Sequence, residues 1–200
     1  MPKETFLNLP EEKKQHLLEL LLEKFYDRPV SQVKVSEIVE AMNMSRGAFY
    51  KYFQDLEDAY TYTVRHFSQV VHQDILTFIQ QNEQDFFLGI EKYLAWCCES
   101  DRESTYWRAL KLLTHSSDRQ AYKRRSFPTD SPMTAQWLRL LEINTFLIDS
   151  VDEAISFLYF IMSLVMTALT DSMANDWTKE ELIRDFRYRT RWLLHGIKQA

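Results

Sequence analysis

The sequence predicts an all-α protein. Its 200 residues include only three glycines and five prolines, too few to punctuate the many turns that a β protein needs. Apolar residues recur at intervals of three and four, the period of one helix face, and no stretch alternates apolar and polar residues over the length of a strand. With 46% hydrophobic residues, the chain can bury a sizeable core, as one domain or two small ones.

The first long helix is expected from the region of Asn8 and Pro10 to about Arg28. Asn8 with Glu11 three residues later forms a capping pattern, and Pro10 suits a first turn. Pro29 ends the helix because a proline disfavours helical backbone in the residue before it. Leucines spaced along one face give this helix a packing role.

Residues 34–53 are expected to form two short helices joined by a tight turn. Apolar residues recur at helical spacing in the first half, Asn43 can adopt the left-handed conformation that ends a helix, and Ser45 can cap the next one. On the second helix Phe49 and Phe53 share one face and leave the others free. This pattern predicts a helix-turn-helix in which one face of the second helix packs against the rest of the chain and the opposite face is free to bind a partner.

The order of residues in the second of these helices is more informative than its period. It runs Ser-Arg-Gly-Ala-Phe-Tyr-Lys-Tyr-Phe from Ser45 to Phe53, and Ile38 and Ala41 precede it. This order resembles the N-terminal domain of the TetR family of transcriptional regulators. The resemblance extends from residue 17 to roughly residue 60, and its specific part is the aromatic run directly after Gly-Ala.

The resemblance implies an organisation for the whole chain. An N-terminal three-helix domain, residues 1–54, would bind a double-stranded DNA operator. A larger C-terminal helical bundle, residues 55–200, would bind an unknown small-molecule effector and form a homodimer through its last two helices. The implied function is that of a ligand-responsive regulator, most often a repressor, without enzymatic activity.

Arg46 is the first candidate for direct base readout, because its planar fork matches two acceptors of guanine. Lys51 is the second candidate. Small residues after Arg46 would allow close approach to the groove, while tyrosines and Lys34 would position the helix through phosphates. The expected DNA-binding set is Lys34, Ser36, Ser45, Arg46, Gly47, Ala48, Tyr50, Lys51 and Tyr52.

Three positions depart from the family pattern. Members usually carry Gly near Pro29, a capping Thr or Ser at the position of Lys34, and a phosphate-contacting Lys at the position of Leu56. Ser36 could provide the cap if its helix begins later than Lys34. The net charge of −5 and the pI of 5.6, with acids outnumbering bases in the first 60 residues, predict modest DNA affinity that falls steeply with salt.

Further helices are expected over residues 55–80, 83–100, 102–116, 137–143 with a possible start at 133, 151–173 and 179–198, with a loop at 126–131. The run 151–173 is the most hydrophobic. Ser156, Ser163 and Thr167 interrupt it and acids flank it, so a buried core helix is favoured over a membrane span.

Aromatic residues and methionine in the second domain could line an apolar ligand pocket, although for any single one of them filling the helical core is the favoured interpretation. The candidates are Trp96, Tyr106, Trp107, Trp137, Phe157, Phe160 and Met162. No metal or cofactor is expected, since the five histidines fit no ligand pattern and no phosphate loop or nucleophile elbow is present.

The adjacent Cys97 and Cys98 cannot form a disulfide framework, and the first residues lack the apolar core of a signal peptide, so a cytoplasmic protein is expected. Two rival functions stay open. In one, a TetR-like protein with weak or no DNA binding acts through a protein partner. In the other, a helical bundle serves as an enzyme or a small-molecule binder, which the missing catalytic constellation disfavours.

Overall fold

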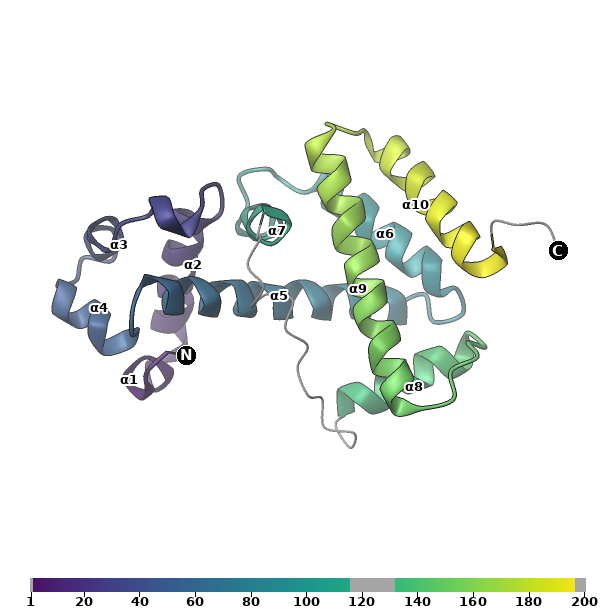
Figure 1. Cartoon of the computed structure of the whole chain (residues 1–200), viewed down its shortest axis with the longest axis horizontal. Coiled ribbons are helices and arrows are strands. Elements are labelled where there is room, and N and C mark those ends of the chain that lie inside the picture. Colours follow the sequence, from purple (N-terminus) through teal and green to yellow (C-terminus); the bar gives the residue numbers. More distant parts are fainter. Residues whose placement is uncertain (1, 116–131, 197–200) are drawn as a thin grey trace. The chain divides into compact units, whose positions relative to one another are not determined.

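A computed structural model describes residues 2–115 and 132–196, and its regular structure over those residues is entirely helical (Figure 1). The predicted all-α fold is confirmed. The elements are α1 (Glu4–Leu7), α2 (Glu11–Phe25), the 3-10 turn η1 (Val30–Gln32), α3 (Val35–Ala41), α4 (Arg46–Tyr52), α5 (Leu56–Gln80), α6 (Phe86–Glu99), α7 (Thr105–His115), α8 (Pro132–Ile143), α9 (Val151–Ala174) and α10 (Lys179–His195). The loop predicted at 126–131 lies outside the described residues.

The start of the chain differs from the prediction. The short helix α1 was not foreseen, and Asn8 ends it rather than capping α2, because the Asn8 backbone N–H donates to the carbonyl of Glu4. Pro10 takes the N-cap position of α2, where no side chain caps the helix. The later predicted helices begin and end within a few residues of the observed bounds wherever those residues are described.

The described residues form two compact units. The first contains residues 2–71 and 100–115, and the second contains residues 72–99 and 132–196. The first sixteen residues of α5 and all of α7 therefore belong with the helix-turn-helix. The predicted division at residue 54 remains a prediction.

The core of the first unit gathers α2 and α4 with the first part of α5 and with α7. Its apolar members include Phe6, Leu18, Leu21, Leu22, Phe25, Ile38, Phe49, Phe53, Val64, Phe67, Ala109 and Leu112. Tyr26 at the end of α2 lies under two cations of α7, with the guanidinium carbon of Arg108 5.6 Å and the ammonium of Lys111 5.4 Å from its ring centroid. Stacking and apolar burial thus fix α7 to the helix that backs the helix-turn-helix.

The second unit is built on two close approaches. Gly89 of α6 leaves no room for a side chain, since a Cβ atom there would lie 2.6 Å from Cα of Ile79 in α5. Trp137 of α8 is buried, and its indole N–H donates to the carbonyl of Ala154 in α9 at 2.8 Å. Backbone contact without an intervening Cβ explains how α6 meets α5 closely, and the satisfied buried indole explains how α8 meets α9.

Helix α9 has the length and the composition of a membrane span, and among the described residues it alone does. A core helix of a water-exposed bundle meets the same criteria. Ala154, Ile161, Val165 and Leu169 are buried inside the second unit, where α9 contacts α6, α8 and α10. Burial of this face by neighbouring helices agrees with the predicted core role.

Candidate functional site

The turn between α3 and α4 has the geometry that the sequence predicts. Asn43 has a positive φ of 47°, and the N–H of the next residue, Met44, donates to the carbonyl of Val39 at 2.9 Å. The Ser45 hydroxyl accepts a hydrogen bond from the backbone N–H of Ala48 at 3.1 Å. The left-handed turn residue and the serine cap are both confirmed, and together they set where α4 begins.

Helix α4 has one buried side and one exposed side. Phe49 is fully buried, as is Phe53 directly after the helix, and their ring centroids lie 5.6 Å apart. The exposed side chains come from four other positions of the predicted set: Ser45, Arg46, Tyr50 and Lys51. The two phenylalanines therefore fix the rotation of the helix, and this rotation turns a cationic and aromatic side to solvent.

Two further residues of α4 lie between these extremes. Ala48 is half-buried, and so is Tyr52, whose ring lies edge-on to Phe6 at 5.9 Å. Gly47 is exposed, and a Cβ atom there would meet nothing nearer than the Ser45 hydroxyl at 3.8 Å. Packing inside the described chain therefore does not require glycine at position 47.

Lys34 and Ser36 lie at the start of α3, and both side chains are exposed. The helix begins at Val35, so Ser36 is inside the first turn and is not its N-cap. The backbone N–H of Lys34 instead donates to the Glu37 carboxylate at 3.2 Å. The glutamate thus satisfies the Lys34 amide, whereas the Glu37 N–H, which a hydroxyl at position 34 would accept, donates to the Lys34 carbonyl at 3.0 Å.

Glu37 also pairs with Arg28, whose guanidinium donates to its carboxylate at 2.6 Å. This hydrogen bond is the main reason that the pKa of Glu37 is held below its ordinary value. The ion pair ties the segment after α2 to α3, so it helps place the first helix of the helix-turn-helix.

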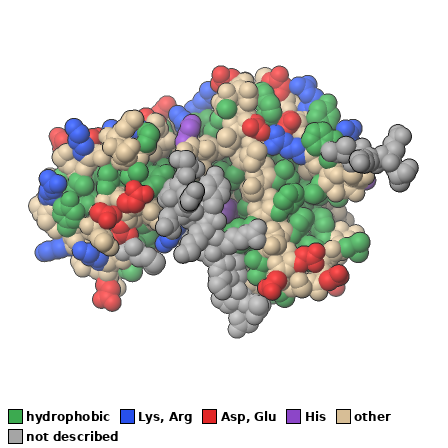
Figure 2. Space-filling model, in the orientation of Figure 1, with side chains coloured by type: hydrophobic (Ala, Val, Ile, Leu, Met, Phe, Trp, Pro, Cys, Tyr) green, Lys and Arg blue, Asp and Glu red, His purple; other side chains and the backbone are tan. Residues whose placement is uncertain are grey.

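The acidic residues after α4 also have structural partners. The Asp55 carboxylate accepts from the N–H of Asp58 at 2.8 Å, and the Asp58 carboxylate accepts from the N–H of Gln54 at 3.0 Å. Leu56 is half-buried against the core of the first unit. The Asp55 carboxylate thus satisfies an amide in the first turn of α5, the Asp58 carboxylate satisfies an amide before the helix, and the leucine is a packing residue. Figure 2 shows basic and acidic side chains mixed on the displayed face of this unit.

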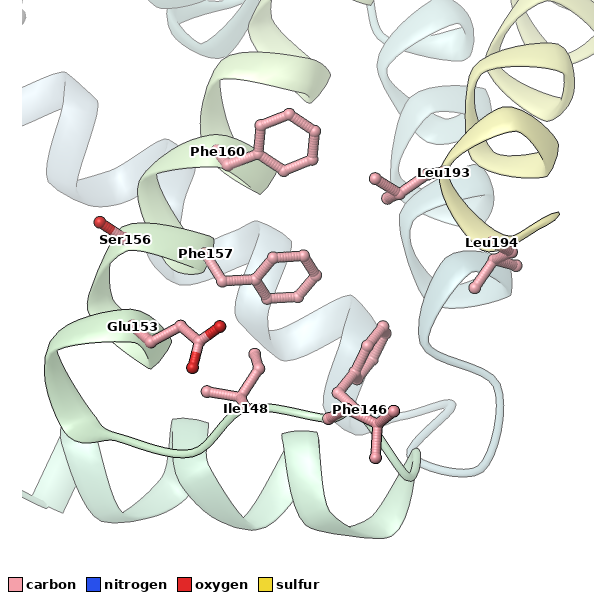
Figure 3. Close-up of a pocket in the computed structure, with 9 residues that line it drawn as sticks. Phe146, Ile148, Glu153, Ser156, Phe157, Phe160, Leu193 and Leu194 are labelled. Carbon is pink, nitrogen blue, oxygen red and sulfur yellow. The ribbon is translucent and has the colours of Figure 1, made fainter. Parts of the chain in front are cut away.

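The second unit contains a cavity of about 470 Å³ between the start of α9, the end of α10 and the segment after α8. In Figure 3 the rings of Phe146, Phe157 and Phe160 and the side chains of Leu193 and Leu194 border this space. Its lining residues are Phe146, Leu147, Ile148, Glu153, Ser156, Phe157, Phe160, Leu193 and Leu194. The walls are apolar and aromatic, with one carboxylate at one side, and the Glu153 carboxylate accepts from the N–H of Asp149 at 2.9 Å.

The residues predicted for a ligand pocket are not gathered in one place. Phe157 and Phe160 line the cavity, whereas Trp137 and Met162 are buried in the core of the second unit. Trp96 lies on α6, where its ring packs beside Phe78 at 5.8 Å. The other two predicted residues, Tyr106 and Trp107, are on α7 and belong to the first unit.

The cavity residues that the sequence did not single out come from two segments. Phe146, Leu147 and Ile148 follow α8, and Leu193 and Leu194 end α10. A signal was available, since an apolar run directly after a helix and two leucines at a helix end are exposed unless something covers them. Periodicity could not show that these segments meet the start of α9.

Neither cysteine chemistry nor a metal centre is indicated by the described residues. Burial raises the pKa of the Cys97 thiol to about 12, so it stays protonated at neutral pH. His66 is half-buried on α5, and this burial lowers its pKa. Across residues 2–115 and 132–196, no three side chains of His, Cys, Asp or Glu lie together in a way that could hold a metal ion.

A capped helix-turn-helix on a small unit, together with a separate helical bundle that has an apolar cavity, defines the class of helix-turn-helix regulators with a helical C-terminal domain. Residues 17–58 match the family described as bacterial regulatory proteins, tetR family, and residues 85–197 match the tetracyclin repressor-like C-terminal domain. The second match covers more than half of the chain. The chain therefore belongs to the TetR family of transcriptional regulators.

Among solved structures, the chain is similar to a TetR family transcriptional regulator from Chloroflexus aurantiacus J-10-FL. The two are 23% identical, the alignment covers 97% of this chain and 91% of that one, and the TM-score is 0.46. The family membership rests on the two family matches and not on this likeness. No protein with a curated description matches the sequence.

Proposed function

We propose that the protein is a ligand-responsive transcriptional repressor that binds a DNA operator as a homodimer. The observation that carries this proposal is the rotation of α4. Phe49 and Phe53 are fully buried on one side, while Arg46, Tyr50 and Lys51 are exposed on the other. Such a helix can enter the major groove with its cationic and aromatic side facing the bases and phosphates.

Each residue of this side has a chemical role in the proposal. Arg46, in the first turn, reads a guanine through two parallel hydrogen bonds, and Lys51 reaches a second base or a phosphate. Because Gly47 and Ala48 are small, they allow the helix to approach the DNA groove closely. Phosphate contacts come from five other residues: Lys34, Ser36, Ser45, Tyr50 and Tyr52. Two copies of α4 in a dimer would read half-sites about 34 Å apart, or a multiple of that distance.

The dimer is proposed to form through α9 and α10. Both helices carry large apolar side chains that the described chain leaves partly exposed, among them Phe160, Tyr188, Trp192, Leu193 and Leu194. Tyr188 and Trp192 stack one turn apart on α10, with ring centroids 6.5 Å apart. An apolar and aromatic surface on two adjacent helices suits a four-helix interface between two copies.

The effector is proposed to bind in the cavity beside Phe146, Phe157 and Phe160. Its aromatic walls favour an apolar or flat molecule of drug-like size. Control requires only that the effector bind one arrangement of the two reading helices better than the other. A coupling of about 1–3 kcal/mol, or roughly 5- to 150-fold in DNA affinity, is typical of such regulation.

A cytoplasmic, non-enzymatic protein fits this role. TetR-type regulators act on chromosomal DNA, which a soluble cytoplasmic protein reaches directly. The family is typically non-catalytic, and the proposal assigns the chain no reaction.

A second candidate function is regulation through a protein partner with weak or absent DNA binding. The acidic balance of the chain favours it, because net charge −5 opposes approach to a polyanion. Under this alternative the exposed side of α4 would be retained without reading bases.

One experiment separates the two functions. The purified protein is used to select duplexes from a randomised pool at roughly 50 mM and 200 mM salt, a range over which phosphate contacts weaken strongly. Enrichment of a two-half-site sequence at both concentrations supports the repressor. Weak binding to every sequence, lost at the higher salt, supports the protein-partner function. A folded monomer at micromolar concentration would contradict the dimer.

A further inference from the structure

The helix proposed to read DNA is too short to hold its shape alone. Helix α4 has seven residues, and isolated helices below about 12 residues are only marginally formed in water. The last four carbonyl groups of any helix also lack partners inside it. The Ser45 cap and the buried Phe49 hold the beginning and the middle of α4. Its C-terminal turn needs support from elsewhere in the chain.

Lys3 provides that support through two separate atoms. Its backbone N–H donates to the carbonyl of Tyr52 at 2.8 Å, and its ammonium donates to the carbonyl of Tyr50 at 2.7 Å. The carbonyl of Phe49 accepts from the N–H of Phe53 at 3.0 Å. Lys3 therefore satisfies two of the carbonyls that end α4, and it places a positive charge at the negative end of the helix dipole.

Phe6 anchors the same segment in the core. It is fully buried, and its ring centroid lies 4.9 Å from that of Phe53 and 5.3 Å from that of Tyr62 on α5. A third ring, that of Tyr52, lies 5.9 Å away. Phe6 thus joins the residues that end α4 to α5, and this anchoring holds Lys3 within reach of the two carbonyls. Figure 1 shows α1 beside α4.

We infer that the segment from Lys3 to Leu7 is a positioning element for the DNA-reading helix. Lys3 orders the last turn of α4, which carries Tyr50, Lys51 and Tyr52. The inference rests on the proposed function and extends it, because the family match to the DNA-binding domain begins only at residue 17. Operator recognition by this chain then depends on a segment that lies outside that match.

The first and last turns of α4 should respond differently to the loss of the Lys3 contacts. The first turn, with Arg46, begins at the Ser45 cap, whereas Lys3 donates to the carbonyls of Tyr50 and Tyr52 in the last turn. Loss of the Lys3 hydrogen bonds should therefore weaken the DNA contacts proposed for Tyr50 and Lys51, while base readout by Arg46 is retained in part. A general loss of folding would remove all three together.

Two substitutions separate the contributions of the Lys3 atoms. Lys3→Met removes the ammonium and keeps the backbone N–H. Lys3→Pro removes both donors, and the observed Lys3 backbone, with φ −76° and ψ 157°, is one that proline adopts readily. Lys3→Arg keeps a cation and tests rescue. Lys13→Met, at an exposed position of α2, is the matched control for the loss of one positive charge.

The experiment measures amide hydrogen exchange of α4, the midpoint of thermal unfolding, and binding to the duplex that the unmodified protein selects. We expect Lys3→Pro to speed exchange at the end of α4 and to weaken binding to the selected duplex at least tenfold, with a smaller loss on an unrelated duplex. For Lys3→Met, the exchange rate and the loss of affinity should fall between those of Lys3→Pro and those of the unmodified protein. For Lys3→Arg, both should be close to those of the unmodified protein. Lys13→Met should weaken binding to both duplexes equally and only slightly.

Two results would overturn the inference: unchanged exchange at the end of α4 in Lys3→Pro, or unchanged affinity and selectivity for the selected duplex. If the unmodified protein selects no duplex, the proposed function fails, while the exchange measurement still decides whether Lys3 orders α4. A fall of the unfolding midpoint together with equal losses on both duplexes would also count against positioning, because it indicates a structural role alone.

Discussion

The guanidinium carbon of Arg46 lies 6.0 Å from the ring centroid of Tyr50, one turn further along α4. Tyr50 in turn lies edge-on to the buried Phe49, with ring centroids 5.4 Å apart. The buried ring thus orients the exposed ring, and the exposed ring restricts the guanidinium. Restricting a long side chain before binding reduces the entropy that is lost when it reads a base.

The first prediction concerns this pair. Arg46→Ala should cost about 1–3 kcal/mol of operator binding and relax the preference at one base pair. Arg46→Lys is the matched control, since it keeps the charge but loses the two-pronged hydrogen bond, so it should recover affinity without recovering the preference. Binding to a set of single-base operator variants checks both. Unchanged affinity and preference in Arg46→Ala would refute its assigned role.

The second prediction uses Gly47. Alanine has the higher helix propensity and no atom of the chain obstructs its Cβ, so Gly47→Ala should raise the free energy of unfolding, by at most about 1 kcal/mol. DNA binding should weaken, because the new methyl group lies on the side that is proposed to approach the groove. Denaturant unfolding and operator binding measure the two effects. A variant with undiminished affinity would show that the groove does not approach position 47.

The third prediction concerns the other helical glycine. A Cβ at position 89 would lie 2.6 Å from Cα of Ile79 and 2.8 Å from the carbonyl oxygen of Phe78. These are backbone atoms that cannot turn aside, so Gly89→Ala should lower the free energy of unfolding by about 1–3 kcal/mol. The same measurement on Gly47→Ala is its control, and the two alanines should act in opposite directions. A neutral Gly89→Ala would mean that α5 and α6 separate at little cost.

The fourth prediction concerns the Arg28–Glu37 ion pair and pH. The hydrogen bond from Arg28 lowers the pKa of Glu37 below its ordinary value of 4.5. The folded state therefore binds this proton less readily than the unfolded state does, so the pair stabilises the fold above about pH 4.5. The contribution is lost as the pH falls through the lowered folded value.

Comparison of the unmodified protein with Glu37→Gln across pH tests this sign. The difference in unfolding free energy between them should be largest near neutrality and should shrink in acid. Arg28→Gln should behave in the same way, because it removes the other partner of the pair. A difference that grows in acid would contradict the assigned cause.

The local features of the helix-turn-helix could be predicted because they depend on neighbours in the sequence. Asn43 in the turn, the Ser45 cap and the shared face of Phe49 and Phe53 all follow from backbone preference and helical period. Ser36 could cap only a helix that begins later, and α3 begins at Val35, which places Ser36 inside the first turn.

The cavity could be predicted only in part. Phe157 and Phe160, two of the predicted residues, belong to the most hydrophobic run and line the cavity. Trp137, also predicted, fills the core instead, because its indole N–H donates to the Ala154 carbonyl. Leu193 and Leu194, near the end of α10, line the same cavity. Which aromatic side chains border a space and which fill the core depends on how helices distant in sequence meet.

The sequence by itself determined the helical class, the turn and caps around α4, and the family, because each depends on residue order over a few turns of helix. Only the tertiary structure decided that Lys3 caps the C-terminal end of α4, a helix whose first residue lies 43 positions later in the sequence. The contact between Lys3 and Tyr50 spans a separation of 47 residues. Residue order carries no direct record of such a contact. It exists because burying Phe6 against Phe53 and Tyr62 brings the two segments together.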